Sequence, residues 1–131
     1  TIAFGVTGIG SVAGAYTQSV KSLLQYQTAL GKDELPTERG CWLTKDDERR
    51  RNLITTLMCH FELELDGEDA EYFAPELASL GPLIEQGLVA ATAKRVELTP
   101  LGRVFVRNVA MVFDAYLKRR SADERPFSRT V

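Results

Sequence analysis

The first apolar segment of the chain is short and continuous, over residues 2–7 ("IAFGVT"). A run of this length that is apolar and partly β-branched predicts a buried strand. The following Gly8–Ile9–Gly10 predicts a turn in which the backbone can approach a ligand closely. Because the full glycine fingerprint of a dinucleotide site is absent, such a turn is more often a tight turn and nothing else.

Two later segments have apolar positions at helical spacing. In residues 17–31 apolar side chains recur every three or four positions, and Gly31 is placed to end a helix. Residues 32–40 ("KDELPTERG") are polar and predict a loop. In residues 44–61, Thr44 can cap a second helix whose first turn is acidic. Its apolar stripe comprises Leu53, Ile54, Leu57, Met58 and Phe61.

The second half of the chain mixes helical and strand patterns. Residues 69–87 predict a helix that is interrupted near Gly81–Pro82. The segments "LVAAT" and "RVELT", separated by "AK", predict a β-hairpin between residues 88 and 98. Thr99 can cap a last helix, with proline at its first position, that extends to about Arg120.

This last predicted helix contains polar residues in an unusual setting. It is apolar on nearly every face from Val104 to Leu117, which predicts burial, yet it includes Arg107, Asn108 and Asp114. Buried charges are costly unless they are paired and hydrogen-bonded, so we expect these three residues to form a buried network. Replacing Arg107 by alanine would then cost about 3–5 kcal/mol of stability. If Arg107 is exposed instead, the same replacement would cost under about 0.5 kcal/mol.

Helices, a hairpin and a final helix in this order resemble a winged helix. The predicted fold is mainly α with a small β-hairpin: a winged-helix-like domain over residues 16–131, preceded by the strand and turn of residues 1–15. Many winged helices bind DNA, so a stand-alone DNA-binding or interaction module is an alternative. The net charge of −2, and a wing whose basic residues are Lys94 and Arg95, argue against a nucleic-acid partner.

Composition places the chain among ordinary soluble domains, with 131 residues, 44% hydrophobic and 26% charged. No apolar run approaches the roughly 20 residues of a membrane span, and the start is not that of a signal peptide, so we expect a cytoplasmic protein. Cys41 and Cys59 are too few and too far apart to suggest a metal site. A chain that opens on a buried strand predicts a piece of a longer protein.

The chain has no visible catalytic constellation. His60 directly follows Cys59, and neighbours on a helix point about 100° apart, which is poor geometry for a nucleophile and its base. We therefore assign no catalytic residue. Arg49–Arg51 have two interpretations: solvated side chains that pair with Asp46 and Asp47 one turn away, or an anion clamp, for example for carboxylates.

Four stretches carry a family resemblance: "RGCWLTKDDERRRNLITTLMCHFEL", "EYFAPEL", "GPLIEQGLV" and, most specifically, "LTPLGRVFVRNVAMVFDAYL". Together they resemble the C-terminal portion of the oxygen-independent coproporphyrinogen III oxidases, which are radical SAM enzymes. "FGVTGIG" resembles the last strand and turn of the family's catalytic barrel, and "FSRTV" its C-terminus. Residues 1–15 would then be the end of that barrel. The connection over residues 62–70 is several residues shorter than in the family.

The resemblance implies a parent enzyme of haem biosynthesis. It would oxidatively decarboxylate two propionates of coproporphyrinogen III to vinyl groups, giving protoporphyrinogen IX. A 4Fe–4S cluster would cleave S-adenosyl-L-methionine (SAM) to a radical. The cluster's Cys-x-x-x-Cys-x-x-Cys motif is absent here, so we expect no metal ligand in this chain and no activity of the chain by itself.

The resemblance also implies roles for particular residues. Ile9 would contact SAM, and the C-terminal domain would cover the mouth of the upstream catalytic barrel, its partner, and exclude water. Arg50, Arg51 and Arg107 are candidates for binding the substrate's propionates, because a guanidinium and a carboxylate can pair through two hydrogen bonds.

Overall fold

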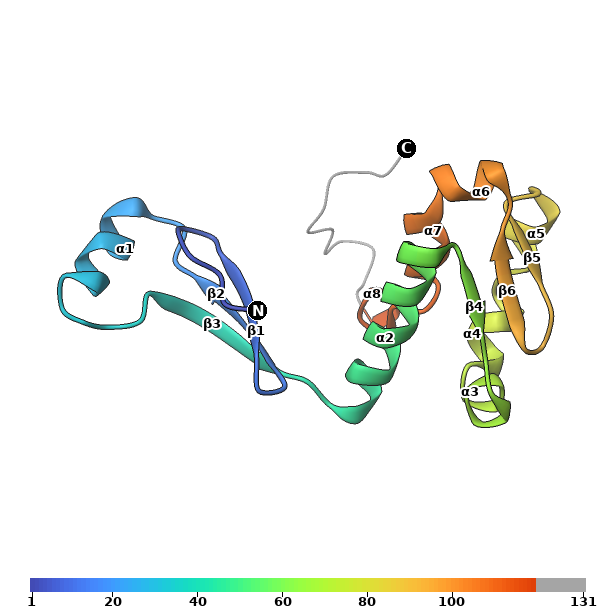
Figure 1. Cartoon of the computed structure of the whole chain (residues 1–131), viewed down its shortest axis with the longest axis horizontal. Helices are drawn as coiled ribbons and strands as arrows, with labels where there is room; N and C mark the ends of the chain where they lie inside the picture. The colour runs from blue at the N-terminus through green and yellow to red at the C-terminus, as the bar shows by residue number, and fades with distance from the viewer. Residues whose placement is uncertain (120–131) are drawn as a thin grey trace. The chain divides into compact units, whose positions relative to one another are not determined.

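The structure is a computed structural model that describes residues 1–119. It divides after Glu48 into two compact units, which are described separately (Figure 1). Unit 1 comprises Thr1–Glu48, and unit 2 begins at Arg49. The expected boundary between residues 15 and 16 falls inside a strand of unit 1, and the assignment of residues 1–15 to a barrel stays a prediction.

Unit 1 is built on an antiparallel sheet with the strand order β1-β2-β3. The strands are β1 (Ile9–Val12), β2 (Ala15–Ser19) and β3 (Thr37–Trp42). A two-residue turn joins β1 to β2, and both of its residues have positive φ, as hairpins of this length require. In the register, Ile9 is opposite Gln18, and Gln18 is opposite Arg39.

The predicted strand over residues 2–7 is wrong, because no strand begins before Ile9. Gly5 has φ of 93° and Thr7 has φ of 59°, and these left-handed conformations interrupt an extended run. The expected turn at Gly8–Ile9–Gly10 is also wrong, since Gly10 lies within β1 opposite Thr17. The apolar residues before Ile9 therefore do not form the strand that their pattern suggested.

The helix expected over residues 17–31 is half its predicted length. Residues up to Ser19 belong to β2, and α1 spans Leu23–Leu30, with Ser22 as its N-cap. The predicted end at Gly31 is confirmed, because its backbone N–H donates to the carbonyl of Gln27. The loop expected over residues 32–40 is wrong from Thr37 onward, where β3 begins.

The second predicted helix is confirmed as α2 (Lys45–His60). Thr44 and Asp47 cap it reciprocally: the Asp47 N–H donates to the Thr44 hydroxyl over 3.1 Å, and the Thr44 N–H donates to the Asp47 carboxylate over 2.8 Å. On the predicted stripe, Leu53 and Leu57 are buried. This helix therefore carries both signals that its sequence suggested, the cap and the apolar face.

Unit 2 contains a second antiparallel sheet with the order β4-β6-β5 (Figure 1). The hairpin expected between residues 88 and 98 is confirmed as β5 (Val89–Ala91) and β6 (Arg95–Leu98). Strand β4 (Glu62–Glu64) was not expected. It follows Phe61, whose φ of 63° ends α2 and turns the chain back beside β6.

Short helices make up the rest of unit 2. The interrupted helix of residues 69–87 is three segments: α3 (Gly67–Tyr72), α4 (Ala74–Ala78) and α5 (Gly81–Glu85). The single last helix is wrong, because the chain forms α6 (Pro100–Val104), α7 (Val106–Met111) and α8 (Ala115–Arg119).

Particular residues mark the ends of these last segments. Thr99 caps α6 as predicted, since its hydroxyl accepts from the Gly102 N–H over 3.0 Å. Phe105 leaves the helical conformation between α6 and α7. The Asp114 carboxylate accepts from the Tyr116 N–H over 2.8 Å at the start of α8. The tail "FSRTV" lies outside the described residues.

The hydrophobic core lies in unit 2. Its buried members run from Leu53 to Phe113 and include Leu57, Phe73, Leu80, Val96, Leu98 and Val109. In unit 1, Gly10 is the one buried residue, and large apolar side chains such as Phe4 and Trp42 are exposed. Helices and small antiparallel sheets therefore agree with the predicted mainly α fold, with more β structure than expected; the winged-helix comparison stays a prediction. Within residues 1–119, no helix has the length and apolar character to cross a membrane.

Candidate functional site

Arg50, one of the predicted propionate ligands, lies in a largely buried ion pair with Glu76. Its Nη1 donates to Glu76 Oε1 over 3.1 Å and to the Phe113 carbonyl over 3.0 Å. The side chains of Arg50 and Glu76 are 15% and 8% exposed. This arginine therefore joins α2 to α4 and to the end of α7. Glu76 was not singled out in the sequence, where one glutamate after Pro75 carries no signal of burial.

Arg49 makes a second, more exposed contact with the same part of the fold. Its Nη2 lies 3.2 Å from Glu68 Oε1, its Nε donates to Asp69, and its guanidinium carbon lies 4.3 Å from the centre of the Tyr72 ring. The hydrogen bond to Asp69 raises the pKa of Arg49. Arg51 is exposed. The three arginines thus do not converge on one open site, and the binding of substrate by Arg50 or Arg51 stays a prediction.

The expected buried network around Arg107 is wrong. Arg107 is exposed, Asn108 and Asp114 are partly buried, and within residues 1–119 the Arg107 guanidinium makes no hydrogen bond or ion pair. The apolar residues of this region lie on both sides of the helices. Val109, Ala110 and Phe113 face the core, whereas Leu101, Val104 and Met111 are 55%, 76% and 44% exposed. An apolar pattern on every face therefore did not mean burial on every face.

This exposure changes the expected effect of Arg107→Ala. We expect the free energy of unfolding of the 131-residue chain to fall by less than about 0.5 kcal/mol, because an exposed side chain without partners is removed. Urea unfolding followed by circular dichroism measures it. Val109→Ala, at a fully buried position of the same helix, is the control and should cost at least about 1 kcal/mol. A loss of about 3–5 kcal/mol for Arg107→Ala would instead support the buried network predicted from the sequence.

Ile9, the predicted SAM contact, is 61% exposed at the start of β1. It borders a hollow of about 260 Å³ on unit 1. The other lining residues come from β2 and β3: Tyr16, Thr17, Gln18, Arg39, Gly40 and Cys41. Arg39 and Gln18 were not singled out, because Arg39 lay in a predicted loop and Gln18 in a predicted helix, so the strand face that they share was not visible.

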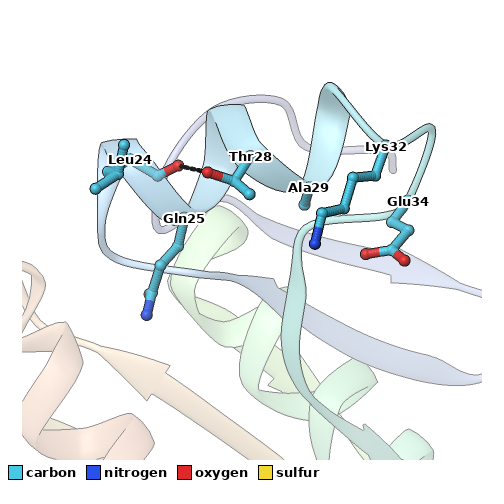
Figure 2. A pocket seen from close by; sticks show the side chains of 6 residues that line it. All are labelled: Leu24, Gln25, Thr28, Ala29, Lys32 and Glu34. Atoms are coloured by element: carbon cyan, nitrogen blue, oxygen red, sulfur yellow. Dashed lines mark hydrogen bonds between the residues drawn. The ribbon is translucent and has the colours of Figure 1, made fainter.

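A second hollow of about 290 Å³ lies against α1 (Figure 2). Its lining residues are Leu24, Gln25, Thr28, Ala29, Lys32 and Glu34. Figure 2 shows Leu24 and Glu34 at opposite ends of this row, and the Thr28 hydroxyl donates to the Leu24 carbonyl of its own helix over 2.7 Å. The polar groups do not converge on a common point, so we assign no site here.

Comparison with known proteins shows which enzymes this chain resembles. No family model matches. Oxygen-independent coproporphyrinogen III oxidase of Synechocystis sp. is 36% identical over 141 residues, covering 99% of this chain and 30% of the relative. The enzymes of the same name from Helicobacter pylori and Thermostichus vulcanus are 38% and 39% identical, and the chain covers 30% and 42% of them. The chain is homologous to a segment of oxygen-independent coproporphyrinogen III oxidases.

A solved structure supports the same conclusion. Coproporphyrinogen III oxidase HemN of Escherichia coli, a radical SAM enzyme, matches with a TM-score of 0.76 and 36% identity over 86% of this chain and 28% of its own. The family resemblance read from the sequence is thereby confirmed. The chain spans about 30% of the length of most curated oxidases that it matches. Nothing in the comparisons supports the alternative of a DNA-binding module.

The cofactors of a radical SAM oxidase fit this segment unequally. A 4Fe–4S cluster is held by cysteine thiolates. This chain has two cysteines, Cys41 and Cys59, both exposed, and the described residues include no group of three or more His, Cys, Asp or Glu that can hold a metal. The segment therefore does not fit the cluster. The hollow beside Ile9 does suit part of SAM, since an exposed apolar side chain there adjoins hydrogen-bonding groups.

Proposed function

We propose that this chain is the C-terminal segment of an oxygen-independent coproporphyrinogen III oxidase. The longer protein would oxidatively decarboxylate two propionates of coproporphyrinogen III to vinyl groups, using SAM and a 4Fe–4S cluster held outside this segment. The observation that carries the proposal is 36% identity to the E. coli oxidase together with a TM-score of 0.76 over 86% of the chain.

Within that enzyme, we assign unit 2 to covering the mouth of the catalytic barrel. The support is a set of exposed side chains on α6 and α7: Leu101, Val104 and Met111 are 55%, 76% and 44% exposed, and Arg107 is exposed as well. Apolar side chains exposed together in this way are typical of a surface that contacts another part of a protein. Covering the mouth would exclude water from the reacting propionate.

The three candidate arginines are not equally placed to bind a propionate. Arg50 already donates to Glu76 and to the Phe113 carbonyl, so a substrate carboxylate would have to displace these contacts. Arg107 is exposed and makes no ion pair within residues 1–119. We therefore assign Arg107, rather than Arg50, as the best-placed propionate ligand. Ile9 would pack against the adenosine of SAM.

A chimera tests the proposed function. The 131 residues replace the homologous segment of the E. coli oxidase, and anaerobic conversion of coproporphyrinogen III to protoporphyrinogen IX is measured by chromatography. We expect activity within about tenfold of the E. coli enzyme, because the two segments share their fold. The control is the E. coli enzyme with the segment deleted, which should be inactive. A soluble chimera with a full iron–sulfur cluster and no turnover would contradict the proposal.

A further inference from the structure

One row of side chains crosses the sheet of unit 1 on the same face. Ile9 of β1 is opposite Gln18 of β2, and Gln18 is opposite Arg39 of β3. Residues directly opposite one another in antiparallel strands project to the same side of a sheet. The same three residues border the hollow of about 260 Å³. An apolar side chain, an amide and a guanidinium therefore border the hollow in one row across the sheet.

The Arg39 guanidinium in this row is hydrogen-bonded through Nε, while its other two nitrogens are not hydrogen-bonded within residues 1–119. Arg39 Nε donates to Gln18 Oε1 over 2.8 Å. Within residues 1–119 the remaining guanidinium nitrogens, Nη1 and Nη2, make no hydrogen bond or ion pair. Gln18 thereby orients the group and leaves the edge that can bind a carboxylate through two parallel hydrogen bonds.

The charge of the lining favours an anion. Of the seven lining residues, Arg39 is charged and none is acidic. The contrast with Arg49 and Arg50 is direct, because each of those already has a carboxylate partner. Beside the cation, Ile9 is 61% exposed and offers an apolar surface. The complementary ligand carries a carboxylate next to a flat or apolar group.

We propose that Arg39, oriented by Gln18, binds a ligand carboxylate in this hollow while Ile9 contacts the ligand's apolar part. The choice of ligand rests on the proposed function, which offers two carboxylates: a propionate of the tetrapyrrole and the methionine carboxylate of SAM. The chemistry at Arg39 is the same for both. Arg39 is thus a binding residue of the segment that the sequence did not indicate.

Binding to the 131-residue chain tests the inference without catalytic turnover. The probes are coproporphyrin III, its tetramethyl ester, SAM, and methylthioadenosine, which lacks the amino-acid carboxylate. Binding is followed by NMR at the Arg39 side-chain Nε–H and the Ile9 methyl groups. We expect one carboxylate probe to bind, its carboxylate-free counterpart to bind at least about tenfold more weakly, and Arg39→Gln to weaken binding by a similar factor.

Two further variants sharpen the measurement. Arg39→Lys keeps the positive charge but lacks the planar guanidinium that can donate two parallel hydrogen bonds. This variant should bind the carboxylate probe with an affinity between those of wild type and Arg39→Gln. Lys32→Gln removes an equal charge from unit 1 outside this hollow and should leave affinity within about twofold. Binding of coproporphyrin III alone assigns the site to a propionate, and binding of SAM alone assigns it to the methionine carboxylate. Equal affinity of acid and ester, or of wild type and Arg39→Gln, would overturn the proposal, as would no binding of either probe.

A second measurement covers the case in which the separate chain does not fold. In the chimera described above, Arg39→Gln should raise KM for the same ligand about tenfold, with Lys32→Gln unchanged. An active chimera whose KM values do not respond to Arg39→Gln overturns this inference and leaves the proposed function intact. If the chimera is inactive but the carboxylate probe binds at Arg39, the proposed function is contradicted and this inference is supported.

Discussion

Glu76→Ala is expected to cost about 3–5 kcal/mol of the free energy of unfolding. Glu76 is 6% exposed, and its carboxylate lies 3.1 Å from Arg50 Nη1. Removing the carboxylate takes the anion away from a guanidinium whose side chain is 15% exposed and which also donates to the Phe113 carbonyl over 3.0 Å. Losing one partner of a buried ion pair costs far more than losing an average contact, because the remaining charge stays largely out of water. Urea unfolding of the 131-residue chain measures the change.

An exposed ion pair of the same unit gives the matched control. Arg95 Nη2 lies 2.9 Å from Glu62 Oε2, and the two side chains are 49% and 51% exposed. Glu62→Ala should cost under about 1 kcal/mol, because water screens and replaces the interaction. Arg50→Met combined with Glu76→Leu should recover much of the loss, since it leaves no buried charge unpaired. Equal losses for Glu76→Ala and Glu62→Ala would show that burial of the Arg50–Glu76 pair does not determine its effect.

The second large effect is expected at Gly102, in the first turn of α6. A Cβ added there would lie 1.8 Å from the carbonyl oxygen of Leu88, a backbone atom that cannot rotate away. The same oxygen accepts from the Thr99 N–H over 3.1 Å, so moving it also disturbs the capped start of α6. We expect Gly102→Ala to destabilise the chain by about 3 kcal/mol, at the upper end of the effects of overpacking.

Gly67→Ala is the control for this substitution. Gly67 also lies in the first turn of a short helix, α3, and apart from its chain neighbours a Cβ there meets nothing within 4 Å. Alanine has the higher helix propensity, so this variant should be neutral or more stable by up to about 1 kcal/mol. Thermal unfolding of both variants compares them directly. If Gly102→Ala stayed within about 0.5 kcal/mol of wild type, the close packing of α6 against Leu88 would be contradicted.

Local signals predicted the parts of the fold that depend on neighbouring residues. Thr44 and Thr99 were identified as caps, and both accept from a backbone N–H three residues later. The hairpin between residues 88 and 98 was also found, because its strands are joined directly. These features involve hydrogen bonds across a few positions, which side-chain type and spacing reveal.

Strands that pair over long separations were missed. Strand β3 pairs with β2 across α1, and β4 pairs with β6 across more than 30 positions. Neither "TERGCW" nor "ELE" has the apolar alternation that marks a strand by itself. Their extended conformation depends on a partner strand that supplies backbone hydrogen bonds, and a local pattern does not contain that partner.

The sequence by itself determined the resemblance to a segment of the oxidases, the caps of α2 and α6, and the hairpin of unit 2. Motifs and short-range hydrogen bonds depend on residues that are close in the sequence. Only the tertiary structure decided which arginine is buried. The pattern suggested Arg107, but Arg107 is exposed, whereas Arg50 is paired with the buried Glu76. The physical reason is that burial depends on which helix faces meet, and these contacts join residues far apart in the chain.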